Sequence, residues 1–128
     1  MELLTKEIRE KFKKLGSQDG KGAEAVCVVK FFDPTGSWTW YTTEFDGKDT
    51  FFGLVDGFEL EWGSFSLSEL KSVRGPFGLG IERDLYGGYP KKLKEVSALK
   101  GRLGSETNNG DEVLSLLPGA DSPQGYGQ

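Results

Sequence analysis

Two groups of carboxylates have the residue types and spacing to do chemistry. Glu82 and Asp84 flank Arg83 directly after a glycine-rich segment, and Asp46 and Asp49 share a predicted turn. Carboxylates can bind Mg²⁺ or Ca²⁺ and can act as general acids or bases. The 46–49 pair lacks the alternating Asp/Asn ligands of an EF-hand loop, so we expect ordinary turn and surface roles for it.

The charges at residues 82–84 have a structural and a chemical explanation. We expect the structural explanation, an ion pair with Arg74 or Arg83, because three adjacent charges beside apolar neighbours need internal pairing. A metal-dependent hydrolase or nuclease built on Glu82 and Asp84 is the weakest alternative. We therefore predict no metal site here.

The residue types most often used in catalysis are scarce. The chain has no histidine, which removes the commonest general base and zinc ligand, and Cys27 is its only cysteine. Residues 75–80 are glycine-rich but lack the spacing of both common nucleotide-binding motifs. We predict no catalytic residue and no cofactor, and hence a protein that is not an enzyme.

The net charge of −4 conceals an uneven distribution. Residues 44–69 contain seven Asp and Glu against Lys48 alone. Such a segment predicts an acidic surface that binds a basic partner surface, with two aromatic residues as anchors. The predicted partner-binding residues are Tyr41, Glu44, Asp46, Asp49, Phe52, Asp56, Glu59 and Glu61.

A basic segment at residues 86–102 offers an alternative, a nucleic-acid-binding surface with aromatic residues among lysines. Its candidate residues are Tyr86, Tyr89, Lys91, Lys92 and Lys94. The sequence pI of about 4.9 opposes this reading, because affinity for phosphate rests on neutralising cations. A solvated basic face is the simpler expectation.

The elements that must position these residues indicate an α+β domain over residues 1–100. We expect an antiparallel meander of about four strands packed with an N-terminal helix and two short C-terminal helices. The helices are predicted at residues 3–15, from Ser66 onwards and at 91–100, and the strands at 25–32, 38–45, 50–55 and 58–62. A flexible Gly/Ser/Asn/Pro-rich tail is expected at 101–128, with an apolar island at 113–117.

The hairpin register predicts which side chains share a face of the sheet. A two-residue turn at Asp56-Gly57 pairs Val55 with Phe58 and Phe51 with Trp62. Trp38 and Trp40 then fall on this apolar face and belong to the core. The other face is expected to be half-polar, and to be either covered by a helix or open to a partner; it carries Tyr41, Phe45, Phe52, Leu54, Glu59 and Glu61.

Several segments taken together resemble a family of small bacterial proteins classed as a domain of unknown function (numbered 2958). The resemblance rests on residues 38–55 (WTWYTTEFDGKDTFFGLV), 63–70 (GSFSLSEL) and 74–86 (RGPFGLGIERDLY), and it covers roughly residues 1–95. It implies an origin on plasmids, phages or other mobile elements, and no established catalytic residues.

These observations predict a non-enzymatic interaction protein of a mobile element. It would bind, and thereby inhibit, a host or element-encoded protein through its acidic surface, as a nucleic-acid mimic or anti-defence factor does. The sequence has no apolar run near the roughly 20 residues that span a bilayer, so we expect a cytoplasmic location and no membrane partner. The oligomeric state is not predicted.

Overall fold

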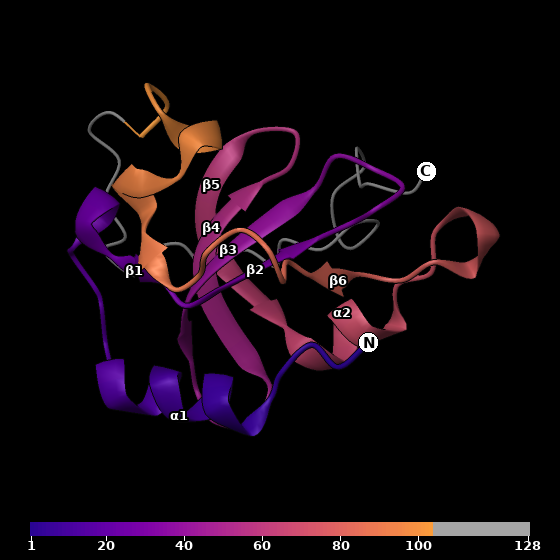
Figure 1. The fold of residues 1–128 in the computed structure, drawn as a ribbon, viewed down its shortest axis with the longest axis horizontal. Helices are drawn as coiled ribbons and strands as arrows, with labels where there is room; N and C mark the ends of the chain where they lie inside the picture. The colour runs from indigo at the N-terminus through magenta and orange to yellow at the C-terminus, as the bar shows by residue number, and fades with distance from the viewer. Residues whose placement is uncertain (104–128) are drawn as a thin grey trace.

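A five-stranded antiparallel sheet forms the centre of the protein, in the order β5-β4-β3-β2-β6 (Figure 1). The computed structural model describes residues 1–103. A separate two-stranded pair joins β1 to β7. The elements are α1 (Lys6–Leu15), η1 (Gly22–Glu24), β1 (Val26–Cys27), β2 (Val29–Phe32), β3 (Thr39–Phe45), β4 (Thr50–Asp56), β5 (Leu60–Ser66), α2 (Leu67–Ser72), η2 (Pro76–Gly78), β6 (Glu82–Arg83), β7 (Lys91–Lys92), η3 (Leu93–Glu95) and η4 (Ser97–Leu99). The predicted α+β class is confirmed.

The first helix has the boundaries that its capping residues dictate. The Thr5 hydroxyl accepts a hydrogen bond from the Ile8 amide at 3.2 Å, and α1 starts one residue later. Gly16, at φ +62°, ends it and donates its N–H to the Phe12 carbonyl. The predicted helix at 3–15 is therefore confirmed, except that its first residues precede the cap.

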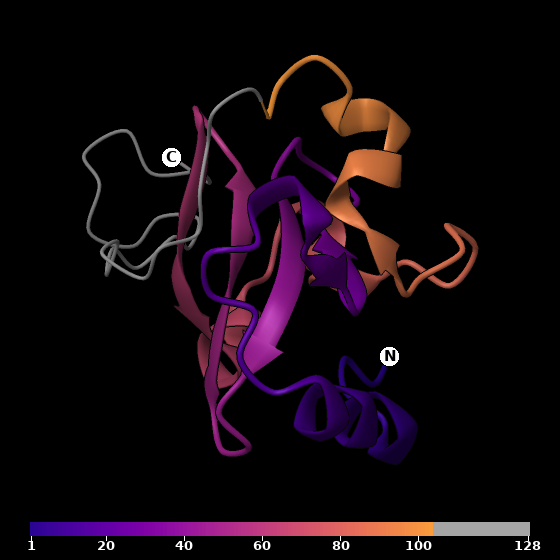
Figure 2. The same cartoon turned by 90° about the vertical axis from the view of Figure 1, so that its left-hand side faces the viewer.

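One face of the sheet, which we call the helix face, packs against α1 and α2. Its core includes Trp38 and Trp40, as predicted, together with Phe51 and Val55. Phe12 of α1 lies 6.0 Å from Phe51, measured between ring centroids. Figure 2 shows α1 lying beside the lower end of the sheet. The tryptophans thus fill a core and do not form a binding surface.

A β-bulge at Thr43 changes the face on which Phe45 lies. The pairing of β3 with β4 runs Thr42–Gly53 and then Glu44–Phe52, which leaves Thr43 unpaired. Phe45 consequently stands opposite Phe51 on the helix face, with ring centroids 4.7 Å apart. The prediction that Phe45 lies on the half-polar face is wrong, because one extra residue reverses the alternation of side chains.

The hairpin between β4 and β5 also differs from the prediction. Its loop is Gly57 to Glu59, and Val55 pairs with Glu61 instead of Phe58. The shift of three positions is odd, so every side chain of β5 changes face. In the observed register Trp62 and Phe65 are both buried, on opposite faces, and only Phe58 is left outside. The longer strand therefore buries more aromatic surface than the tight turn would.

The second face, which we call the C-terminal face, carries Tyr41, Leu54 and Trp62 and has its own core. Residues 93–103 cover this face. Of the two alternatives predicted for the half-polar face, covered or open to a partner, the structure shows the covered one. The covering side chains are Leu93, Val96, Leu99 and Leu103, all buried. Two cores on opposite sides of one sheet account for the small number of exposed aromatic rings.

The covering segment is not the predicted helix at residues 91–100. Lys91 and Lys92 pair with β1, and the chain then makes two successive 3₁₀ turns. The Leu93 amide donates to the Ala25 carbonyl at 2.9 Å, which ties the segment to β1. A spacing of three residues between apolar side chains suits 3₁₀ turns as well as an α-helix, and the pairing with β1 decides between them.

The predicted tail at 101–128 lies almost entirely outside the described residues, as does its apolar island at 113–117. Its first residues are described and belong to the fold. Leu103 is buried in the core of the C-terminal face, and the Arg102 guanidinium pairs with Asp56.

Candidate interaction surface

Four predicted partner-binding residues lie together at the end of the sheet where β3 turns into β4. Glu44, Asp46 and Phe52 line a groove of about 520 Å³, and Asp49 belongs to the same turn. The end of α1 contributes Lys13 to the opposite wall. This group of residues, Glu44, Asp46, Asp49 and Phe52, is called the acidic end below.

Within the acidic end, a carboxylate and an aromatic ring stand side by side. Glu44 and Phe52 are direct partners in the β3–β4 pairing, so their Cβ atoms are roughly 5 Å apart. The Phe52 ring is half-buried and stacks on Trp62, with centroids 6.0 Å apart and planes at 8°. The Glu44 carboxylate accepts a hydrogen bond from the backbone of Gln18 at 2.9 Å, which fixes its position.

The Asp46 carboxylate holds the turn together. One of its oxygens accepts hydrogen bonds from the amides of Lys48, Asp49 and Thr50, at 2.8 to 3.0 Å. These backbone donors, Lys48 first, lower the pKa of Asp46, so the side chain stays ionised at neutral pH. Among the described residues, no hydrogen bond is seen to the second carboxylate oxygen of Asp46. Asp46 therefore stabilises the turn and also carries negative charge on the surface.

Asp49 connects the turn to the start of α2. It accepts hydrogen bonds from the Ser66 hydroxyl and from both the hydroxyl and the amide of Ser68, at 2.8 to 3.0 Å. The Ser66 hydroxyl in turn accepts a hydrogen bond from the Glu69 amide at 3.0 Å, which makes Ser66 the N-cap of α2. The Ser68 hydrogen bonds lower the pKa of Asp49, which therefore remains charged.

The other predicted acidic residues lie at the far end of the same strands. Asp56 ends β4, six residues after Thr50, which is roughly 20 Å along the strand. Its carboxylate pairs with Arg102 through two hydrogen bonds of 2.9 and 3.0 Å. Glu59 and Glu61 lie in the adjacent loop and in β5. The acidic residues of 44–69 therefore form two separate groups and not one surface.

Tyr41 does not lie on the surface. It is 2% exposed and belongs to the core of the C-terminal face. Burial raises the pKa of its hydroxyl to about 12. The prediction of Tyr41 as a contact residue required an open half-polar face. Residues 93–103 cover that face, so Tyr41 cannot contact a partner.

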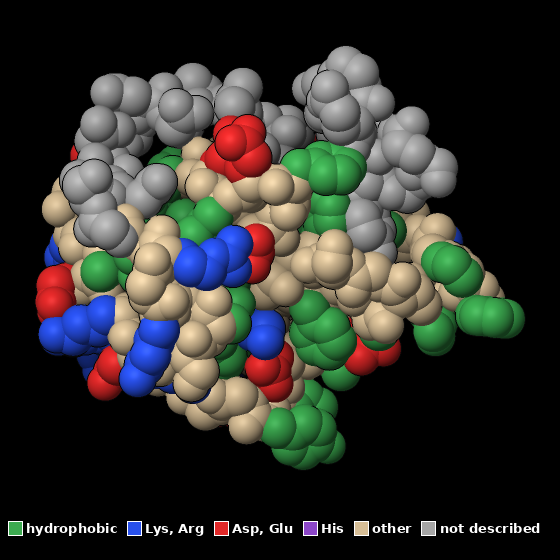
Figure 3. Space-filling model, turned by 90° about the horizontal axis from the view of Figure 1, so that it is seen from above, with side chains coloured by type: hydrophobic (Ala, Val, Ile, Leu, Met, Phe, Trp, Pro, Cys, Tyr) green, Lys and Arg blue, Asp and Glu red, His purple; other side chains and the backbone are tan. Residues whose placement is uncertain are grey.

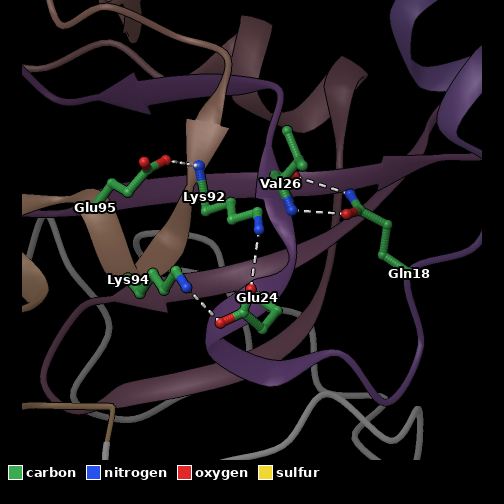
Figure 4. Close-up of polar contacts among 6 residues, drawn as sticks. All are labelled: Gln18, Glu24, Val26, Lys92, Lys94 and Glu95. Atoms are coloured by element: carbon green, nitrogen blue, oxygen red, sulfur yellow. Dashed lines mark hydrogen bonds and ion pairs between the residues drawn. The ribbon is translucent and has the colours of Figure 1, made fainter.

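Most of the predicted nucleic-acid-binding side chains contact other residues of the chain. Lys92 and Lys94 form ion pairs with Glu24 at 3.0 and 2.7 Å, as Figure 4 shows. Lys91 lies over the Tyr89 ring, 5.0 Å from its centroid. Figure 3 shows basic and acidic side chains interspersed on the face of the molecule seen from above. Only Tyr86 of this set stands clear of the domain, at 94% exposure.

Within the charged segment at residues 82–84, the carboxylate of Asp84 contacts other residues of the chain. Asp84 forms an ion pair with Lys30 at 3.6 Å, and it accepts hydrogen bonds from the amides of Tyr86 and Gly87. The expected ion pair is therefore present, but its partner is neither Arg74 nor Arg83, because pairing of β6 with β2 places Lys30 alongside. Within residues 1–103, no three His, Cys, Asp or Glu side chains are grouped as metal ligands would be.

Comparison with known families gives one match. The profile of a family described as "Protein of unknown function (DUF2958)" matches residues 3–105. The chain belongs to this family. The match confirms the resemblance seen in the sequence and carries no function with it. Curated proteins and solved structures gave no match. In the described part of this DUF2958 domain, no helix has the length and apolar character to cross a membrane.

The DUF2958 domain also exposes apolar side chains that the sequence did not single out. Phe58 is 62% exposed in the β4–β5 loop, resting edge-on against Trp38. Phe77 is 97% exposed in the turn after α2, with Leu79 nearby at 43%. From the sequence, residues 75–80 were recognised only as a glycine-rich segment without a nucleotide-binding motif, since no sequence pattern indicates that a phenylalanine in a turn faces solvent.

Proposed function

We propose that this protein acts by binding another protein, without catalysing a reaction, and that the acidic end receives a basic segment of that partner. The observation that carries the proposal is the pairing of the Glu44 carboxylate with the half-buried Phe52 ring in one groove, with Asp46 on its wall. A lysine or arginine side chain is attracted by carboxylates and by the face of an aromatic ring.

The geometry supports this function because the charges of the acidic end are held in place before any partner arrives. Asp46 and Asp49 are fixed by backbone and serine donors, and both remain ionised. Preorganised charge reduces the cost of ordering side chains on binding and favours one register of the partner.

The kind of partner follows from this chemistry. Proteins that handle nucleic acid present lysines and arginines on their binding surfaces. An acidic protein seated on such a surface inhibits it by occupying the site. We extend the proposal to a host or mobile-element protein of that kind, on the implication of the family resemblance.

The alternative, direct binding of nucleic acid by residues 86–102, has weaker support. Two of its lysines share one carboxylate, that of Glu24, whose pKa is lowered by hydrogen bonds from Lys94 and then Lys92. Phosphate would have to compete with this carboxylate for both lysines.

The test removes charge while it keeps the hydrogen bonds. The double variant Glu44→Gln, Asp46→Asn retains acceptor oxygens for the Gln18 and turn amides, so it should fold normally. We would isolate the stoichiometric partner from nuclease-treated host lysate with the wild-type chain, and then measure Kd by calorimetry. We expect the double variant to bind about tenfold or more weakly.

The matched control is Glu59→Gln, which removes one exposed carboxylate at the far end of the strands. We expect it to bind as the wild type does. Equal affinity of the double variant and the wild type, or an equal loss in the control, would refute the assignment to the acidic end. Recovery of nucleic acid in place of a protein would favour the alternative.

A further inference from the structure

The turn between α2 and β6 presents a phenylalanine to solvent in a conformation that phenylalanine disfavours. Phe77 has φ +63° and ψ +17°, in the left-handed region, and its side chain is 97% exposed. Left-handed backbone costs free energy for any residue with a Cβ, and glycine or asparagine normally takes such positions. The exposed ring buries nothing in return.

This turn is held rigidly by its neighbours. The Gly75 amide donates to the Leu79 carbonyl at 2.7 Å, and the Gly78 amide donates to the Gly75 carbonyl at 3.1 Å. A Cβ on Gly75 would lie 2.5 Å from the Thr35 hydroxyl, so the base of the turn packs closely against the β2–β3 loop. The ring is thus presented by a closed, anchored turn.

The turn projects from the domain at a different place from the acidic end. Figure 1 shows the segment between α2 and β6 extending beyond the sheet, and Figure 3 shows hydrophobic side chains at this right-hand extremity. Lys71, Arg74 and Leu79 are exposed, and they line one hollow together with Gly78, the residue that follows Phe77. The Arg74 guanidinium donates to the carbonyls of Lys71 and Val73, both at 2.7 Å, which keeps its positive charge at the base of the turn.

We propose that Phe77 is a binding anchor that inserts into an apolar pocket with an acidic rim on a protein partner. An aromatic side chain on a preorganised turn loses little entropy on binding and gains the full burial of its ring. Lys71 and Arg74 supply the complementary charge for carboxylates around the pocket. A residue in the left-handed region whose side chain buries nothing within the domain favours a role in binding. The proposal does not depend on the acidic end. It rests on a different part of the surface, where the charged side chains are those of Lys71 and Arg74.

The experiment places a photoreactive probe at the tip of the turn. Phe77 is replaced by p-benzoylphenylalanine in the full chain, and the native host is irradiated. We expect one adduct with a second protein that resists nuclease. The same replacement at Leu85, which is 53% exposed in another turn, is the control and should not give this adduct.

Two variants then test the role of the ring and the charge with the purified captured protein. Phe77→Asn suits the left-handed backbone, so its melting temperature should equal or exceed that of the wild type while its affinity falls about tenfold or more. Lys71→Glu should weaken binding and make it less sensitive to salt. Leu85→Ala should bind as the wild type does.

Other results would overturn the proposal. A lower melting temperature in Phe77→Asn would give the ring a structural role. An adduct with a second copy of the chain would make the turn a self-association contact, and an adduct with nucleic acid would make it a stacking site. Absence of any adduct, or unchanged affinity in Phe77→Asn, would leave no binding role for Phe77. Unchanged affinity in the acidic-end double variant would overturn the proposed function and leave this one standing.

Discussion

Gln18 offers the sharpest test of how the fold positions the acidic end. Its side chain is fully buried, and its amide nitrogen donates to the carbonyls of Val26 and Thr43, both at 2.8 Å. Its amide oxygen accepts the Val26 N–H at 2.6 Å (Figure 4). One side chain therefore satisfies the backbone at the start of β1 and at the bulge of β3. We predict that Gln18→Leu, which keeps the approximate volume, strongly destabilises the domain.

The magnitude follows from the three hydrogen bonds that the variant removes. Each contributes about 1 kcal/mol net, and a buried backbone group left without a partner costs about 1–3 kcal/mol. The loss should be about 3 kcal/mol or more, against a total stability of about 5–15 kcal/mol for a domain of this kind. At about 4–8 °C per kcal/mol, the melting temperature should fall by about 12–24 °C.

The assay is urea and thermal unfolding followed by circular dichroism, with Asp19→Ala as the control. Asp19 is the next residue in the same loop and is exposed, so its replacement should change stability by less than about 0.5 kcal/mol. A Gln18→Leu variant within 1 kcal/mol of the wild type would refute the reasoning, because the three backbone groups would then have found other partners. The variant keeps the backbone N–H of Gln18 that donates to Glu44, so weaker binding at the acidic end would report a displaced loop and not a lost donor.

Three further predictions concern other parts of the fold. The pKa values of Asp46 and Asp49 are lowered by folding, so their contribution to stability is complete above their unfolded pKa and is lost as the pH falls through the folded pKa. Acid titration of Asp46→Asn should accordingly show a shallower loss of stability below pH 4 than the wild type. Gly53→Ala should cost about 1–3 kcal/mol in urea unfolding, or prevent folding, because the new methyl group would overlap the Tyr41 carbonyl oxygen. Burial raises the pKa of the Cys27 thiol, so a thiol reagent should label it only after unfolding; rapid labelling of the native protein would contradict its burial.

The sequence alone determined the parts of the fold that depend on neighbours a few residues apart. The cap at Thr5, the glycine at position 16 and the apolar stripe between them specify α1 without any distant contact. The cap at Ser66 likewise specifies the start of α2. The sequence also predicted that Trp38 and Trp40 are core, because alternation along one strand decides which side chains share a face.

The register of the sheet could not be predicted from local signals. The Asp56-Gly57 pair favours a tight turn, but the burial of both Trp62 and Phe65 requires the longer loop. The carbonyl of Thr43, at the bulge, accepts a hydrogen bond from Gln18, which lies 25 residues earlier in the chain. Each change is odd in number and therefore reverses the faces of all residues beyond it.

The candidate site shows the same division. The sequence determined that residues 44–69 are acidic, and it predicted that Asp46 and Asp49 share a turn. The bulge at Thr43, which the structure shows, brings Glu44 opposite Phe52. Only the tertiary structure paired Asp56 with Arg102, 46 residues later in the chain. Charge is a property of composition, but a surface is made by the pairing of strands and by what packs on them. That packing depends on contacts between residues distant in sequence, which local patterns do not encode.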